Sequence, residues 1–271
     1  MEIKISDFIN KLMDIYNADP SGYAPFAYWK IRDLCEDARA FWLPEFDCYY
    51  MIRDRHLLVY YSPDNKNHIP ISELNSLDCI SMKASVFNTI KDQLTGFNVN
   101  YFDCLFYDKK HEPLQASDST YYASNFDFSE EEHYRLAAGI IDEHEGSGFF
   151  SADNIKKMTG FSAFAPELWF FVRERSTDEP VGICITAYEP EVSEADLDWI
   201  YIRTKYQGRG AGRFMIEEIV RRTVDHSKVI RVGGTVGFYK RCGFYTREVN
   251  VWAAKPGYTF YAPRIQPNVL T

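Results

Sequence analysis

The segment Leu197–Gly212, LDWIYIRTKYQGRGAG, joins an apolar run to a glycine-rich turn. It begins as an apolar strand, places Gly208, Gly210 and Gly212 at every second position, and leads into RFMIEEIVRR, which predicts an amphipathic helix. Backbone N–H groups at the start of a helix have no partner within it and carry the positive end of its dipole. Glycines let such a backbone approach an anion closely. The segment therefore predicts a phosphate or pyrophosphate site.

The spacing of the glycines separates several kinds of phosphate site. A dinucleotide site needs G-x-G-x-x-G and an acidic residue about 20 residues later, so an NAD-dependent oxidoreductase is disfavoured here. A P-loop needs G-x-x-x-x-G-K-[ST], which this sequence lacks. The residues Gln207–Gly212 fit the pattern [QR]-x-x-G-x-[GA] instead.

The second half of the chain alternates strands and helices around this segment. Ser129 and Glu132 are expected to form a capping box at the start of its first helix. The whole order predicts an α/β (α+β mixed) fold, with a sheet flanked by helices. We expect strands at 121–128, 168–173, 181–188, 197–202, 229–232 and 244–252, and helices at 129–142, 153–158, 210–225 and 235–241.

At this point the sequence resembles the GNAT superfamily of acyl-CoA-dependent N-acyltransferases. The element order is similar to that of the family, and Gly237–Phe244, GFYKRCGF, resembles its closing F-Y-x-x-x-G-F segment. The resemblance implies a GNAT-like mixed, mostly antiparallel sheet over 116–271, with acetyl-CoA as co-substrate and no metal. Many relatives carry an Asn between the two motifs, where this chain has Val232–Val236, VGGTV.

The resemblance also implies a role for each motif residue. Tyr239 is expected to be the general acid that protonates the departing thiolate. The general base is expected to be Asp198 or Asp196, which lie on one strand face by the two-residue period, and the spacing does not choose between them. The strand 197–202 is expected to splay from 229–232. The residues expected to contact CoA are Tyr201, Ile202, Arg203, Gln207, Gly208, Arg209, Gly210, Ala211 and Gly212.

The first part of the chain carries no recognisable catalytic motif. We expect an α+β domain over 1–115, a linker near 108–120 and the acyltransferase domain over 116–271. The N-terminal domain is expected either to cap the acceptor cleft or to be a degenerate half-copy of the same fold. Its expected helices are 3–18, 27–41 and 86–94, and its expected strands are 48–54, 56–61 and 99–107.

Composition limits the setting and the partners of the protein. The 271 residues are 46% hydrophobic and 25% charged, and no apolar run approaches the roughly 20 residues of a membrane-spanning helix. The formal charge of -9 disfavours nucleic acid as a partner. The six cysteines are widely spaced, which predicts free thiols and a cytoplasmic protein. We expect no membrane partner and allow for a homodimer.

The acceptor is not encoded in any motif. The acidic run at 189–198 is either a solvated loop or part of the acceptor mouth, where carboxylates favour a small cationic amine or a peptide amine. The leading hypothesis is transfer of an acetyl group from acetyl-CoA to a primary amine by direct attack in a ternary complex. The alternative is a non-catalytic CoA-binding sensor. His133 and His144 are too far apart along the chain for a metal-binding pair.

Overall fold

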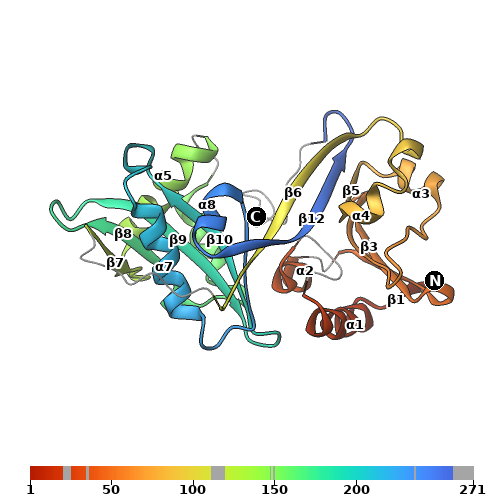
Figure 1. The fold of residues 1–271 in the computed structure, drawn as a ribbon, viewed down its shortest axis with the longest axis horizontal. Coiled ribbons are helices and arrows are strands. Elements are labelled where there is room, and N and C mark those ends of the chain that lie inside the picture. The colour runs from red at the N-terminus through yellow and green to blue at the C-terminus, as the bar shows by residue number, and fades with distance from the viewer. Residues whose placement is uncertain are drawn as a thin grey trace. The chain divides into compact units, whose positions relative to one another are not determined.

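The computed structural model describes residues 1–20, 26–34, 37–110, 120–146, 148, 150–234 and 236–258, which divide into two units (Figure 1). Within the described residues, the first unit comprises Met1–Leu105 and the segment 246–258, and the second comprises Phe106–Tyr245. The first unit thus includes a segment from the far end of the sequence. The division at 115 into domains with separate roles stays a prediction, and most of the expected linker lies outside the described residues.

The first unit is a mixed sheet with short helices. Strands β4 and β5 run parallel, whereas the pairs β1–β2, β2–β3, β3–β4 and β5–β12 are antiparallel. In sheet order its strands are β1 (Glu2–Ile3), β2 (Arg39–Leu43), β3 (Cys48–Arg53), β4 (His56–Tyr61), β5 (Cys79–Lys83) and most of β12 (Phe244–Ala254) and of β6 (Asn98–Tyr107). Its helices are α1 (Ile5–Ala18), α2 (Tyr28–Leu34), α3 (Ile71–Ser76), α4 (Ala84–Phe87) and the 3-10 turns η1 (Pro44–Phe46) and η2 (Lys91–Gln93).

The helix predicted at 27–41 is wrong in its second half. Helix α2 ends at Leu34, and β2 pairs with β3 along its whole length. The ring of Phe41 stacks on Tyr50 at a centroid distance of 4.8 Å. Aromatic residues fit a pleated sheet once a neighbouring strand is available, so tertiary pairing overrides the local helical pattern. The helix predicted at 86–94 is likewise split between α4 and η2.

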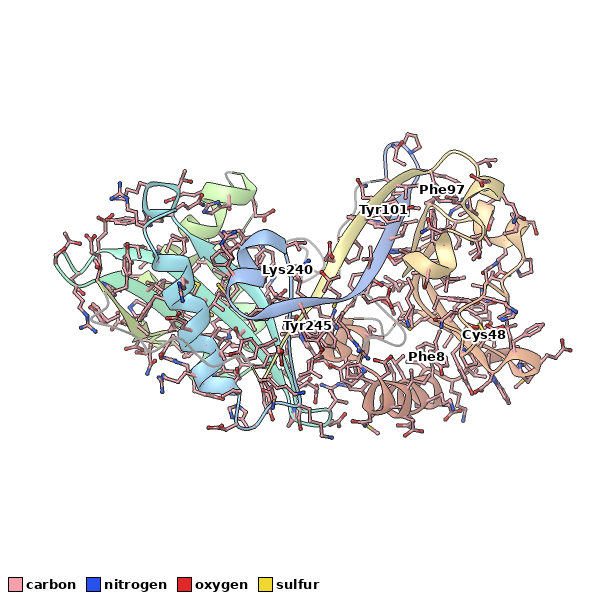
Figure 2. All side chains as sticks on the ribbon, in the orientation of Figure 1. Phe8, Cys48, Phe97, Tyr101, Lys240 and Tyr245 are labelled. Carbon is pink, nitrogen blue, oxygen red and sulfur yellow. The ribbon has the colours of Figure 1, made fainter. Side chains whose placement is uncertain are left out.

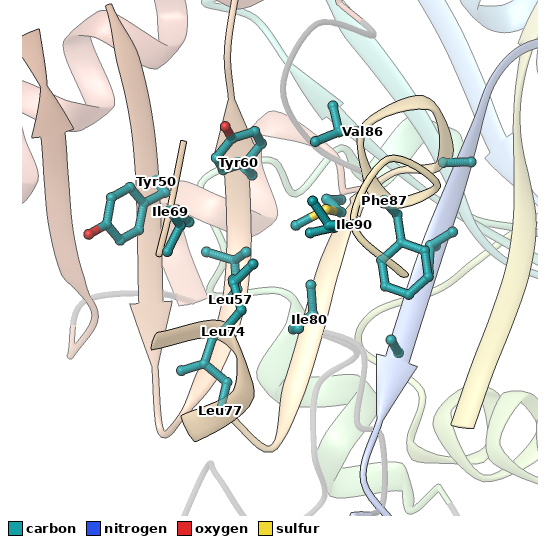
Figure 3. Packing of buried hydrophobic residues seen from close by; sticks show 14 of the residues in the cluster. Tyr50, Leu57, Tyr60, Ile69, Leu74, Leu77, Ile80, Val86, Phe87 and Ile90 are labelled. Carbon is teal, nitrogen blue, oxygen red and sulfur yellow. The ribbon is translucent and has the colours of Figure 1, made fainter. Parts of the chain in front are cut away.

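The core of the first unit lies between the sheet and the short helices that follow β4 and β5. Leu57 and Ile80 on these two strands are fully buried, and Leu74 and Phe87 from α3 and α4 pack in the same cluster (Figure 3). Strand β4, HLLVYY, is buried at almost every position, which explains its continuous apolar sequence. On helix α1 the side chain of Phe8 is also buried (Figure 2).

The second unit confirms the predicted order of elements and the mixed α/β fold class. Strands β10 and β11 run parallel, and the pairs β7–β8, β8–β9 and β9–β10 are antiparallel. In sheet order its strands are β11 (Val229–Gly233), β10 (Glu194–Ile202), β9 (Pro180–Glu189), β8 (Phe170–Glu174) and β7 (Tyr121–Asn125). Its helices are α5 (Glu131–Glu145), α6 (Ala152–Met158), α7 (Ala211–Thr223), α8 (Val236–Arg241) and the 3-10 turns η3 (Pro166–Leu168) and η4 (Thr204–Tyr206).

Helices cover both faces of the second sheet. Ile183 and Trp199 lie in the apolar cluster formed with α5 and α6. On the other face α7 approaches so closely that a Cβ on Gly182 would lie 2.8 Å from Met215. The alternation of neighbouring β9 residues between the two faces follows from the two-residue period of a strand. Strand β10 is therefore held between helices on both sides.

The capping box predicted at the start of α5 is wrong. The N-cap is Glu130, and its side chain makes no capping hydrogen bond. The Ser129 hydroxyl donates instead to Asp127 at 2.6 Å, within a turn that precedes the helix. Short polar side chains often bond locally in this way, in competition with helix capping.

Two expectations about the setting of the protein can be compared with the described residues. None of the described helices is long and apolar enough to cross a membrane. Cys48, Cys79, Cys104, Cys184 and Cys242 are free thiols, as expected, and the structure buries them, whereas Cys35 lies outside the described residues. Burial raises the pKa of the Cys48 thiol to about 11. Such a thiol stays protonated and unreactive at neutral pH.

Candidate active site

Strand β10 leads through η4 into the glycine turn and then into α7, as the sequence predicts. Gly208 and Gly210 have φ angles of +73° and +91°, a region that residues with a Cβ rarely adopt. Among the described residues, no atom lies within 4 Å of a Cβ built on either glycine. A Cβ on Gly212 would instead lie 3.2 Å from the ring of Phe238. The backbone of the turn is thus shaped by glycine and is open on its outer side.

The start of α7 offers backbone N–H groups to an anion. Its N-cap is Gly210, and no side chain caps the helix there. The positive end of the helix dipole lies at the same place. The guanidinium of Arg209 lies 5.8 Å from the Tyr206 ring centroid, and Arg213 pairs with Glu217 at 2.9 Å. The predicted pyrophosphate residues therefore lie at one helix terminus with positive charge on either side.

Strands β10 and β11 separate beside this turn. Their parallel pairing ends at Leu197↔Val232, whereas β10 continues to pair with β9 as far as Ile202↔Gly182. The register of β10 against β9 shifts after Leu197, which makes Asp198 a bulge residue that bends the strand. The expected splay between the two strands is present.

The end of β10 is held by the end of α5. Nε2 of His144 lies 2.9 Å from the carbonyl oxygen of Ile202, and Nε2 of Gln207 donates to the same oxygen at 3.2 Å. The ring of Tyr201 stacks on His144 at 5.1 Å, and its hydroxyl donates to Glu145. The carbonyl of Ile202, a residue expected to contact CoA, is therefore already hydrogen-bonded to two side chains of the protein.

Arg203 follows the last residue of β10 and also has partners within the protein. Its backbone N–H donates to the Val181 carbonyl at 2.8 Å, and its guanidinium lies 3.1 Å from the carboxylate of Glu143. Ile202 and Arg203 thus have protein partners that would compete with the contacts expected from the resemblance.

Tyr239 lies on α8, in the second motif. Its side chain is 7% exposed, and burial raises the pKa of its phenol well above its usual range. The ring covers Gly234, where a Cβ would lie 2.8 Å from Cε2 of the tyrosine, and meets Phe244 at 5.6 Å. No described residue forms a hydrogen bond with the hydroxyl. At neutral pH the phenol keeps its proton, which is the form that a general acid requires.

The two candidate bases have different surroundings. Asp196 is 5% exposed, and its Oδ1 lies 3.9 Å from Nε of Arg231, whose Nη1 lies 3.3 Å from Glu194. Asp198 is half-buried, at the bulge where β10 and β11 separate. The bulge interrupts the two-residue period by which both carboxylates were expected to share a face. Sequence reasoning missed Arg231, because only the strand register places it beside Asp196.

The two histidines of α5 have separate partners. Nδ1 of His133 accepts a hydrogen bond from the backbone of Asp127 at 2.8 Å, whereas His144 contacts the end of β10. Across the described ranges, no group of His, Cys, Asp and Glu side chains is arranged to hold a metal ion.

Residues 166–246 match the model of the family described as "Acetyltransferase (GNAT) domain". The matched range contains the glycine turn, both splayed strands and Tyr239. Residues 166–246 are a GNAT acetyltransferase domain. No curated protein matches the sequence of the chain.

The fold similarity extends beyond the GNAT domain. A GCN5-related N-acetyltransferase from Sphaerobacter thermophilus has a TM-score of 0.65 and 14% identity, over 96% of this chain and 96% of that one. A GNAT acetyltransferase from Colwellia psychrerythraea has a TM-score of 0.63 and 13% identity, over 94% and 99%. A tandem GNAT protein from the clavulanic acid biosynthesis pathway has a TM-score of 0.59 and 9% identity, over 96% of this chain and 99% of that one. These likenesses concern the fold, and they favour a GNAT-like half-copy over an unrelated cap for the first unit.

Proposed function

We propose that the GNAT domain transfers an acetyl group from acetyl-CoA to a primary amine by direct attack in a ternary complex. One observation carries the proposal. The glycine turn, the splayed part of β10 and the protonated phenol of Tyr239 follow one another within a single unit. Together they supply an anion site, a strand that has parted from its parallel neighbour and a proton donor, which are the parts that an acyl-CoA-dependent transfer needs.

The residues present fit the pyrophosphate of CoA. Gly208 and Gly210 leave the outer side of the turn open. The N–H groups at the start of α7 lie at the positive end of the helix dipole. Arg209 and Arg213 add positive charge beside them. When bound, acetyl-CoA supplies an activated acyl group whose leaving thiolate is stable. The protein therefore has to position the two reactants and move two protons.

Tyr239 is proposed to donate the proton that the thiolate takes up. Burial keeps the phenol neutral, and no described residue competes for its hydroxyl hydrogen. Because a thiolate leaves readily, the acid is needed only moderately. Its contribution falls within the 10²–10⁴-fold typical of acid–base catalysis.

Asp198 is the better of the two candidate bases. It lies at the bulge where β10 parts from β11, and its side chain is partly exposed. Asp196 is buried beside Arg231, so protonating it would leave that guanidinium less well compensated. The net charge of -9 favours a cationic acceptor, namely a small amine or the amine of a peptide.

Tyr239→Phe tests the proposal because it removes only the hydroxyl. We expect kcat to fall by about 10²–10⁴-fold, while the Kd for CoA stays within about twofold of the wild type. Tyr245→Phe is the matched control, since Tyr245 is 43% exposed on β12 (Figure 2) and should leave kcat unchanged.

The measurements are an acetylation assay with polyamines, aminosugars and lysine peptides, and a calorimetric titration with CoA. An unchanged kcat in Tyr239→Phe contradicts the acid role. Binding of CoA without acetylation of any amine class supports the sensor instead. Absence of any CoA binding refutes the pyrophosphate site itself.

A further inference from the structure

The two halves of the chain repeat one order of elements, and their strands part at equivalent places. Strand β4 pairs with β5 only as far as Leu57↔Ile80, just as β10 pairs with β11 only as far as Leu197↔Val232. In both halves the register of the longer strand shifts at the next residue, which is a bulge. Helix α3 begins as far after Leu57 as α7 begins after Leu197, and α4 and α8 begin equally far after Ile80 and Val232. The turns and helices of the halves therefore correspond residue by residue.

The glycine turn of the second half has no glycine in the first. Pro70 is the N-cap of α3 with a φ of -54°, where Gly210 has +91°. Proline also lacks the N–H that an anion would accept from. The counterparts of Gly208, Gly210 and Gly212 are His68, Pro70 and Ser72.

A carboxylate of the chain, that of Asp64, accepts hydrogen bonds just before and within the first turn. Oδ1 of Asp64 accepts from the Ser62 hydroxyl at 2.5 Å. The same oxygen accepts from the Lys66 N–H at 3.0 Å and lies 3.0 Å from Nε2 of His68. The hydrogen bonds from Ser62 and His68 hold the pKa of this carboxyl well below its usual range. A negative charge therefore already lies beside this turn and would repel an incoming pyrophosphate.

Two further residues of the first half differ in chemistry from their counterparts in the second half. One has the opposite charge, and the other lacks a hydroxyl. Glu73 lies in the first turn of α3, where the second half has Arg213, so the first helix presents a negative charge to an anion. Phe87 occupies the place of Tyr239, is 1% exposed and packs in the apolar cluster of the first unit (Figure 3). The first half therefore lacks both the anion site and the hydroxyl of an acid.

We infer that the first unit is a closed, inactive copy of the acyltransferase fold, and that the chain binds one acyl-CoA, in the GNAT domain. The inference rests on the proposed function for the site in the second unit. Its physical content is that the first turn has a proline in place of Gly210, and that the N–H groups of His68 and Ile69 already donate to Tyr60 and Asn67 within the chain.

A calorimetric titration of the full chain with CoA counts the sites. We expect one CoA per chain. Gly210→Ala should weaken binding at least tenfold, because alanine is strained at a φ of +91° and the backbone of the turn has to change to relieve that strain. Pro70→Ala is the matched variant at the equivalent position and should change the Kd by less than twofold.

Circular dichroism and thermal unfolding check that each variant folds. Arg213→Glu, at a side chain that is half exposed, provides a second variant in the turn should Gly210→Ala fail to fold, and it should also weaken binding. Two CoA per chain, or binding lost in Pro70→Ala and kept in Gly210→Ala, overturns the inference alone. A count of zero in the wild type refutes the proposed function as well.

Discussion

His56 should make the protein sensitive to mild acid. This histidine lies at the start of β4, is 4% exposed, and its Nε2 lies 2.8 Å from the hydroxyl of the buried Ser81. Its Nδ1 lies 3.3 Å from the hydroxyl of Tyr258. Burial lowers the pKa of the imidazole from 6.5 to about 3. The folded chain therefore holds His56 neutral over a pH range in which the unfolded chain binds a proton.

The direction and size of the effect follow from this difference. Below pH 6.5 the unfolded state takes up a proton that the folded state does not, so stability is lost as the pH falls from about 6.5 towards about 3. At about 1.4 kcal/mol per pH unit the full interval corresponds to a loss on the order of 5 kcal/mol. Between pH 6 and 5, before most carboxylates titrate, His56 alone should cost roughly 1 kcal/mol of unfolding free energy.

Urea unfolding followed by tryptophan fluorescence at pH 7.5, 6.0 and 5.0 measures this slope. His56→Gln keeps a polar side chain beside Ser81 but cannot titrate, so its stability should change by roughly 1 kcal/mol less than that of the wild type between pH 6 and 5. His226→Gln removes an exposed histidine and should leave the slope as it is. Equal slopes in the wild type and His56→Gln would refute the reasoning.

Two small substitutions test the geometry of the second unit. In Gly234→Ala the new Cβ would lie 2.8 Å from Cε2 of Tyr239 and must displace the ring, so kcat should fall by about tenfold or more while CoA still binds. An unchanged kcat would show that the ring position does not matter. Ser151→Ala removes the hydroxyl that accepts from Asn154 N–H at 3.2 Å and caps α6, which should lower the unfolding free energy by about 1 kcal/mol. Urea unfolding checks this, and equal stability would show that the cap contributes nothing.

The order of elements in the second unit could be predicted because each element carries a local signal. The strand and helix periodicities are clear there, and the glycine turn marks the junction of β10 and α7. The elements of the first unit are less predictable from the sequence, because β2 forms through its pairing with β3 rather than through any local pattern. No local signal shows that the segment after Tyr245 joins the sheet of the first unit either, since strand pairing is decided by distant residues.

The candidate site divides in the same way. The glycine turn and Tyr239 could be located from the sequence, since the glycine spacing and the closing motif are local features. The bulge at Asp198 could not, because an extra residue in one strand is visible only against its partner strand. Arg231 beside Asp196, and the hydrogen bond of His144 to Ile202, depend equally on segments that meet only in the folded chain.

The two halves differ less in backbone geometry than in the side chains at equivalent positions. Both have a bulged strand that parts from a parallel neighbour, so this backbone geometry alone cannot distinguish an active unit from an inactive one. Gly210 in place of Pro70 supplies an N–H and a left-handed backbone, and Tyr239 in place of Phe87 supplies a hydroxyl. These differences are small in volume but large in hydrogen-bonding capacity. A fold can therefore stay the same while the hydrogen-bond donors on which its chemistry depends are lost.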